Sequence, residues 1–152
     1  KNLVNAYKMI NLISKDIGYE VKAYTSTKNC NQELLNFGNI DYVFNDIYVS
    51  LSFCEGMPII VYHALFKGSA LFLSNCWSHI EIYNLLTDFG LENRVYISSF
   101  NNKDNLIKGL NELKKRIDSD KQESVKEKLV NLRNFLLREY EMNLTKLSET
   151  IK

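Results

Sequence analysis

The residues best suited to chemistry lie between Ser52 and Glu81, in the stretch SFCEGMPIIVYHALFKGSALFLSNCWSHIE. This stretch holds the only proline, both histidines and two of the three cysteines of the chain. An apolar strand is expected before Glu55, and a helix is expected from Pro58, whose fixed φ suits a first helical turn. Gly56 between them lets a ligand approach the backbone closely. The turn therefore predicts an anion site, because free N–H groups and the helix dipole favour negative charge there.

Plainer interpretations of the same residues stay open. The turn also fits an ordinary connection between a strand and a helix, with Glu55 as a solvent-exposed carboxylate. His63, in the middle of the next predicted helix, suits helix packing as well as ligand contact. Cys76-x-x-His79 is one half of a zinc motif without a matching second pair, so no metal is expected.

Several separated motifs in this window occur in the order found in one enzyme family. The sequence reads Ser-x-x-Glu-Gly-x-Pro, then a helix ending Ala-x-x-x-Gly, then an apolar strand and Ser-Asn-x-x-Ser-His-x-Glu, over Ser52 to Ile82. In this order the window resembles glycosyltransferase family 4. Lys1-Asn2-Leu3 followed by Ala6-Tyr7 is similar to that family's Lys-Asn-Leu…Ala-Phe segment. The resemblance implies the C-terminal, donor-binding domain of a retaining enzyme of the GT-B fold, in which two Rossmann-like domains enclose a cleft.

The resemblance also implies roles for individual residues around a nucleoside diphosphate sugar, which is the donor substrate rather than a cofactor. Glu55 matches the first glutamate of a Glu, seven residues, Glu pair and faces the donor sugar, and Lys1 approaches the pyrophosphate if the N-terminus is ordered. His79 and Glu81 match a His-x-Glu at a helix start and serve mainly to cap or orient the loop beside the donor. The turn whose backbone meets the sugar and the diphosphate is matched by Gly56, Met57, Pro58 and Ile59.

The chain departs from the family pattern at His63, where the second glutamate of the pair is expected to hold the ribose hydroxyls. A neutral imidazole accepts one hydrogen bond, whereas a carboxylate can hold two vicinal hydroxyls at once. This difference bears directly on donor affinity. The acceptor-binding N-terminal domain is also missing, so we expect the chain not to transfer sugar on its own.

The elements around the window predict an α/β fold with a Rossmann-like, doubly wound parallel sheet, formed by one domain that spans residues 1–152. Strands are expected at residues 19–24, 46–53, 70–73 and 94–98. Helices are expected at residues 3–17, which end at Gly18, at residues 58–67 and 78–88, and around residues 106–117, with a weaker helix at residues 32–37.

The last predicted element is a long helix over residues 124–151. Apolar residues keep helical spacing along it, and Ser124 with Glu127 indicates a capping box at its start. At about 1.5 Å per residue, this helix would reach about 40 Å, which is longer than a domain of this size needs. We therefore expect its far end to pack on the missing domain or on a partner protein.

Composition excludes several classes of protein. The chain has 152 residues, 45% hydrophobic and 24% charged, with a net charge of +1, so no overall field favours nucleic acid or an anionic membrane. Three cysteines at irregular spacing favour a reducing, cytoplasmic setting over a disulfide framework. No apolar run is long enough to span a bilayer, so any membrane contact would come through the part that the chain lacks.

Three functions remain in view. The leading one is the donor-binding domain of a retaining glycosyltransferase. The alternative is a non-catalytic, degenerate glycosyltransferase-like module that binds a partner protein, which the long terminal helix and His63 support. A flavodoxin-like binding domain of the same architecture is the third, because a fold alone does not determine function.

Overall fold

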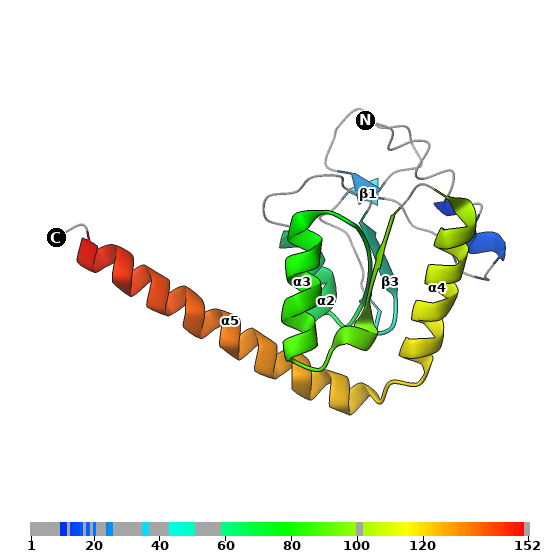
Figure 1. The fold of residues 1–152 in the computed structure, drawn as a ribbon. Helices are drawn as coiled ribbons and strands as arrows, with labels where there is room; N and C mark the ends of the chain where they lie inside the picture. The colour runs from blue at the N-terminus through cyan, green and yellow to red at the C-terminus, as the bar shows by residue number, and fades with distance from the viewer. Residues whose placement is uncertain are drawn as a thin grey trace.

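A parallel three-stranded sheet forms the centre of the fold, in the order β3–β4–β5 (Figure 1). The structure is a computed structural model, and it describes residues 10–11, 13–16, 18, 20, 24–25, 35–36, 43–50, 59–99 and 102–150. The central strands are β3 (Ile47–Ser50), β4 (Ala70–Ser74) and β5 (Val95–Ser98). A second parallel pair joins β1 (Tyr24–Thr25) and β2 (Leu35–Asn36). The predicted parallel sheet is thus confirmed for the described strands.

The middle strand shows why this sheet is apolar. Every residue of β4 is buried, because β3 and β5 flank it and helices cover both of its faces. A strand buried on both faces reads as a continuous apolar run rather than as an alternating one. Ala70 pairs with Ile47 on one side, and Leu71 pairs with Val95 on the other.

The helices divide between the two faces of the sheet (Figure 1). Leu71 and Leu73 pack with α2 and α3 on one face, where the first turns of α5 also contribute. Phe72 points to the other face and packs with α4 and with Ile13 of the N-terminal helical residues. A 3-10 turn, η2, leads into β5. The bounds are α2 (Ile59–Phe66), α3 (Trp77–Asp88), η2 (Glu92–Arg94), α4 (Lys103–Asp118) and α5 (Gln122–Thr150).

A glycine stops α2 where the sequence indicated. Gly68 has a φ of 93°, which places it in the left-handed region that side chains avoid. A Cβ atom at this position would also lie 2.7 Å from Cδ2 of Phe44. The helix therefore ends with a turn that leads directly into β4.

Another glycine lets α4 approach the sheet closely. A Cβ atom at Gly109 would lie 2.6 Å from Cε1 of Tyr96 and 2.9 Å from Cε2 of Phe72, whose rings stack at 5.4 Å. Alanine is the better helix former by about 1 kcal/mol, but forcing a methyl group into a filled core costs about 1–3 kcal/mol. We therefore expect Gly109→Ala to lower the free energy of unfolding by about 1 kcal/mol, measured by urea denaturation. The exposed neighbour Lys108→Ala is the control, and a Gly109→Ala chain as stable as the original would refute this close contact.

Two local expectations are wrong. The helix expected at residues 32–37 is not formed at Leu35 and Asn36, which pair as strand β2 with β1, so long-range pairing overrides a weak helical pattern. The expected capping box at Ser124 is displaced as well, because α5 already begins at Gln122 and the amide of Val125 donates to the carbonyl of Lys121. Ser124 therefore lies inside the first turn rather than before it.

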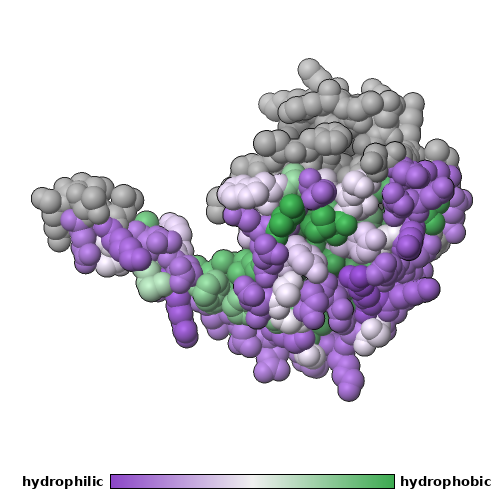
Figure 2. All heavy atoms as spheres, in the orientation of Figure 1, coloured by the Kyte–Doolittle hydropathy of each residue, from purple (hydrophilic) through white to green (hydrophobic). Residues whose placement is uncertain are grey.

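The expected long terminal helix is confirmed as one helix, α5, through Thr150. Its first turns bury Val125, Leu129 and Leu132 against α2 and α3. The remainder extends away from the domain, and Figures 1 and 2 show it as a projecting arm with hydrophobic surface along its middle. Tyr140 is 62% exposed and Leu144 is 48% exposed. No helix within the described ranges combines the length and the apolar character needed to cross a membrane.

Candidate functional site at the carboxyl edge of the sheet

The three central strands present their carboxyl ends at one edge, which lies at the top of the sheet in Figure 1. Each of them ends in a buried serine: Ser50, Ser74 and Ser98. The amide of Asn75 donates to the carbonyl of Ser98 at 3.1 Å, which ties the loops after β4 and β5 together. In open parallel sheets, ligands bind at this edge.

A buried histidine holds the loop between β4 and α3. His79 is fully buried, and its Nδ1 lies 3.0 Å from both the hydroxyl oxygen and the carbonyl oxygen of Ser74. Because a carbonyl oxygen only accepts, the second hydrogen bond requires the proton on Nδ1. The amide of Cys76 also donates to the carbonyl of Ser74 at 2.9 Å. This is the position of a residue that orients the loop rather than one that contacts a ligand.

Glu81 lies two residues further along α3 and is exposed. Burial raises the pKa of the Tyr62 hydroxyl on α2, and the negative charge of Glu81 raises it further. The rings of Tyr62 and Phe66 stack along α2 with their centroids 6.5 Å apart.

The two residues of α2 that the family resemblance assigns to the donor, Ile59 and His63, are exposed. His63 is exposed, which argues against the helix-packing interpretation. Ile59, the first residue of α2, is 66% exposed. Lys1, Glu55, Gly56, Met57 and Pro58 lie outside the described residues. Residues 51–58 connect the end of β3 to the start of α2, so four of the expected site residues belong to this connection.

One residue at this edge was not singled out from the sequence. Trp77, the only tryptophan in the chain, opens α3 and is 75% exposed. Its position inside the Ser-Asn-x-x-Ser motif was the available signal. The structure brings it to the same edge as Ile59 and Glu81.

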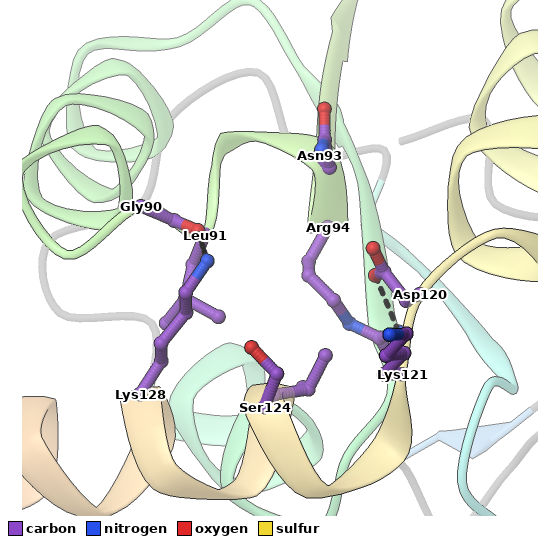
Figure 3. A pocket seen from close by; sticks show the side chains of 9 residues that line it. Gly90, Leu91, Asn93, Arg94, Asp120, Lys121, Ser124 and Lys128 are labelled. Atoms are coloured by element: carbon purple, nitrogen blue, oxygen red, sulfur yellow. Dashed lines mark hydrogen bonds and ion pairs between the residues drawn. The ribbon is translucent and has the colours of Figure 1, made fainter.

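The opposite edge of the sheet carries a structural junction centred on Arg94 (Figure 3). Arg94 is 1% exposed and donates to the carbonyl of Gly68 at 2.5 Å, to Oδ1 of Asn45 at 2.8 Å and to Oδ2 of Asp120 at 3.2 Å. Burial lowers the pKa of Arg94, and the hydrogen bond and charge of Asp120 partly offset this. The cavity beside it holds about 40 Å³, whereas sites for organic ligands are about 300–1,000 Å³.

The described residues contain no group of three or more His, Cys, Asp or Glu side chains placed to hold a metal ion. Comparison with known proteins adds no assignment: no family model, no curated protein and no solved structure matches the chain.

Proposed function

We propose that this chain is the donor-binding domain of a retaining glycosyltransferase that uses a nucleoside diphosphate sugar, with the Rossmann-like, doubly wound sheet of one GT-B half. The proposal is supported by the arrangement of residues at the carboxyl edge of the sheet. Two successive β–α units, β3–α2 and β4–α3, run in the same sense, and the motif residues Ile59, His63, His79 and Glu81 lie in the first two turns of their helices. This is the edge at which nucleotides bind in such sheets.

In this proposal the diphosphate lies against the backbone from Gly56 to Ile59, where the N-terminus of α2 offers free N–H groups and a positive dipole end. The same groups stabilise the charge that develops on the leaving nucleoside diphosphate, so no metal is needed. Glu55 orients the donor sugar, and His63 contacts the ribose. The acceptor site is completed by the N-terminal domain, and the chain alone binds the donor without transferring it.

Removing the sugar-facing carboxylate tests this arrangement. We expect Glu55→Ala to weaken binding of a nucleotide sugar by about tenfold or more while leaving the bare nucleoside diphosphate nearly unaffected. The physical reason is the loss of hydrogen bonds to a charged group, worth about 1.5–3 kcal/mol. Isothermal titration calorimetry of the full chain with UDP-glucose, GDP-mannose, UDP and GDP makes the measurement.

His63 supplies the matched variants for the same titration. His63→Glu introduces a carboxylate that can hold two ribose hydroxyls. It should therefore raise the affinity for nucleotide sugars and for bare nucleoside diphosphates. His63→Gln, which is uncharged, is the control and should not. If no donor binds the original chain or His63→Glu at millimolar concentration, the donor-site proposal is wrong.

The second candidate, a degenerate module that binds a partner protein, is favoured by one observation. The distal part of α5 carries Leu137, Tyr140, Met142 and Leu144 at 48–62% exposure. Scattered apolar residues are normal on a surface, but a projecting helix that exposes several of them in succession is typical of an interaction surface.

A further inference from the structure

A small polar cavity lies between the turn after α3 and the first two turns of α5 (Figure 3). Its volume is about 40 Å³. A single water molecule requires about 10–15 Å³, so the space holds a few atoms but not the body of a nucleotide or a sugar. Any specific ligand of this cavity must therefore be a small ion or molecule, and the surrounding side chains determine its charge.

Positive charge dominates the side chains around the cavity. Arg94, Lys121 and Lys128 line it, against the single carboxylate of Asp120. That carboxylate is already paired with Arg94, with Oδ2 and Nη1 3.2 Å apart. The ion pairs within the described ranges include neither of the two lysines. The cavity therefore carries two positive charges that no described carboxylate neutralises.

The ammonium group of Lys128 is held in place at one wall. Its Nζ donates a hydrogen bond to the carbonyl oxygen of Gly90 at 2.6 Å. Gly90 has a φ of 64°, and a Cβ atom there would lie 3.3 Å from the same Nζ, so the glycine leaves room for the ammonium group. An ammonium group has three N–H donors, and this bond uses one of them. Lys128 is thus a positioned cation with donors left for a ligand.

Arg94 lies on the other side of the cavity, and Figure 3 shows the hydroxyl group of Ser124 between the two cations. The side chain of Arg94 is 1% exposed, and its three hydrogen bonds use only Nη1 and Nη2. Among the residues that the structure describes, the Nε–H of Arg94 therefore has no acceptor. Leaving a buried donor without an acceptor is unfavourable, and burial also lowers the pKa of this guanidinium. An anion in the cavity would offset both costs.

We propose that this cavity binds one small divalent oxyanion, inorganic phosphate or sulfate, between the ammonium group of Lys128 and the guanidinium group of Arg94. The exposed side chains of Lys121 and Ser124 complete the site on its outer side. The two lysine charges match the charge of such an ion, and its oxygens accept hydrogen bonds from both cations. The bound ion joins the turn after α3 to the start of α5. The site lies at the opposite edge of the sheet from the proposed donor site, so neither depends on the other.

Inorganic phosphate provides the direct test. The full chain is titrated with sodium phosphate by isothermal titration calorimetry, at neutral pH and at an ionic strength held constant with sodium chloride. We expect saturable binding of one ion, and sulfate should compete with phosphate whereas chloride should not. The urea midpoint should rise with phosphate and then rise more slowly once the site is filled, because a ligand that binds only the folded state stabilises it by mass action.

The two lysines supply the variants. Lys121→Gln and Lys128→Gln should each weaken phosphate binding by about tenfold, since a hydrogen bond to a charged group is worth a factor of about ten or more. Lys126→Gln removes the same charge from the same helix outside the cavity, so it is the matched control and should leave the affinity unchanged. Lys128→Gln also loses its bond to Gly90, so the compared quantity is the affinity for phosphate rather than the stability itself. Circular dichroism checks the fold of each variant.

Three results would overturn the inference. No heat of binding with inorganic phosphate would exclude the site. A phosphate effect of equal size in the original chain and in Lys121→Gln and Lys128→Gln would be the general exclusion of phosphate from protein surfaces. Phenyl phosphate and phosphoserine test the size limit: if either binds as tightly as inorganic phosphate, the site takes the phosphoryl group of a larger molecule, and the assignment to a free ion is wrong.

Discussion

Arg94→Met is expected to lower the free energy of unfolding by about 3–5 kcal/mol, because it removes one partner of a buried ion pair. The guanidinium joins the turn before β3, the turn before β4 and the junction of α4 with α5, through Asn45, Gly68 and Asp120. It also lies over the ring of Phe44 at 5.0 Å. Methionine fills much of the volume but donates no hydrogen bond, so a carboxylate, an amide oxygen and a carbonyl oxygen lose their partner together.

Urea denaturation followed by circular dichroism measures this loss, with Arg138→Met on the exposed part of α5 as the matched control. Arg94→Lys should recover only part of the stability, because an ammonium group cannot reach several acceptors in one plane. The double variant Arg94→Met with Asp120→Asn should be more stable than Arg94→Met alone, since it removes the uncompensated charge. A loss below about 1 kcal/mol for Arg94→Met would show that the junction is not held by this side chain.

Periodic apolar patterns made most of the regular elements predictable. The run that became β4 is buried on both faces and so reads as a continuous apolar segment, whereas β3 and β5 beside it are partly half-buried. The stripe from Leu106 to Ile117 became the buried face of α4. Gly68 ended α2 as expected. Its φ is positive, and glycine adopts such a φ at a much lower energetic cost than other residues do. These signals act within a few residues, and a sequence displays them directly.

Contacts between distant residues were not predictable in the same way. Arg94 and Asn45 are 49 positions apart, and nothing near either residue indicates that they meet. The two-residue strand β2 depends likewise on its pairing with β1 rather than on its own pattern. Local propensity is a weak guide wherever tertiary pairing decides the outcome.

The candidate site shows the same division. The sequence indicated the turn after β3 and the motif on α3, because both carry recognisable residues at regular spacing. It could not indicate that Trp77, at the start of α3, is 75% exposed. The buried state of His79 and the exposed state of His63 also emerge only from the packing of α2 and α3. The chemical character of the edge is therefore a property of the fold more than of any one motif.

The second large effect is expected on α5, where the same substitution should be costly at one position and nearly neutral at another. Leu132 is fully buried against α2 and α3, so Leu132→Ala should lower the free energy of unfolding by about 2–5 kcal/mol. Leu144 is 48% exposed on the projecting arm, so Leu144→Ala should change it by no more than about 0.5 kcal/mol. Both exchanges replace leucine with alanine inside the same helix, so helix propensity cancels and the difference reports tertiary burial alone.

Urea denaturation of both variants at low and high protein concentration completes the comparison. If the arm is uncovered in the isolated chain, Leu144→Ala stays neutral at every concentration, and the free apolar surface is left for another protein surface. If Leu144→Ala lowers stability only at high concentration, the arm pairs with a second copy, because association stabilises a folded state by mass action. A loss at Leu144 that equals the loss at Leu132 and does not depend on concentration would mean that the chain itself covers the arm, and both uses of the arm would then be excluded.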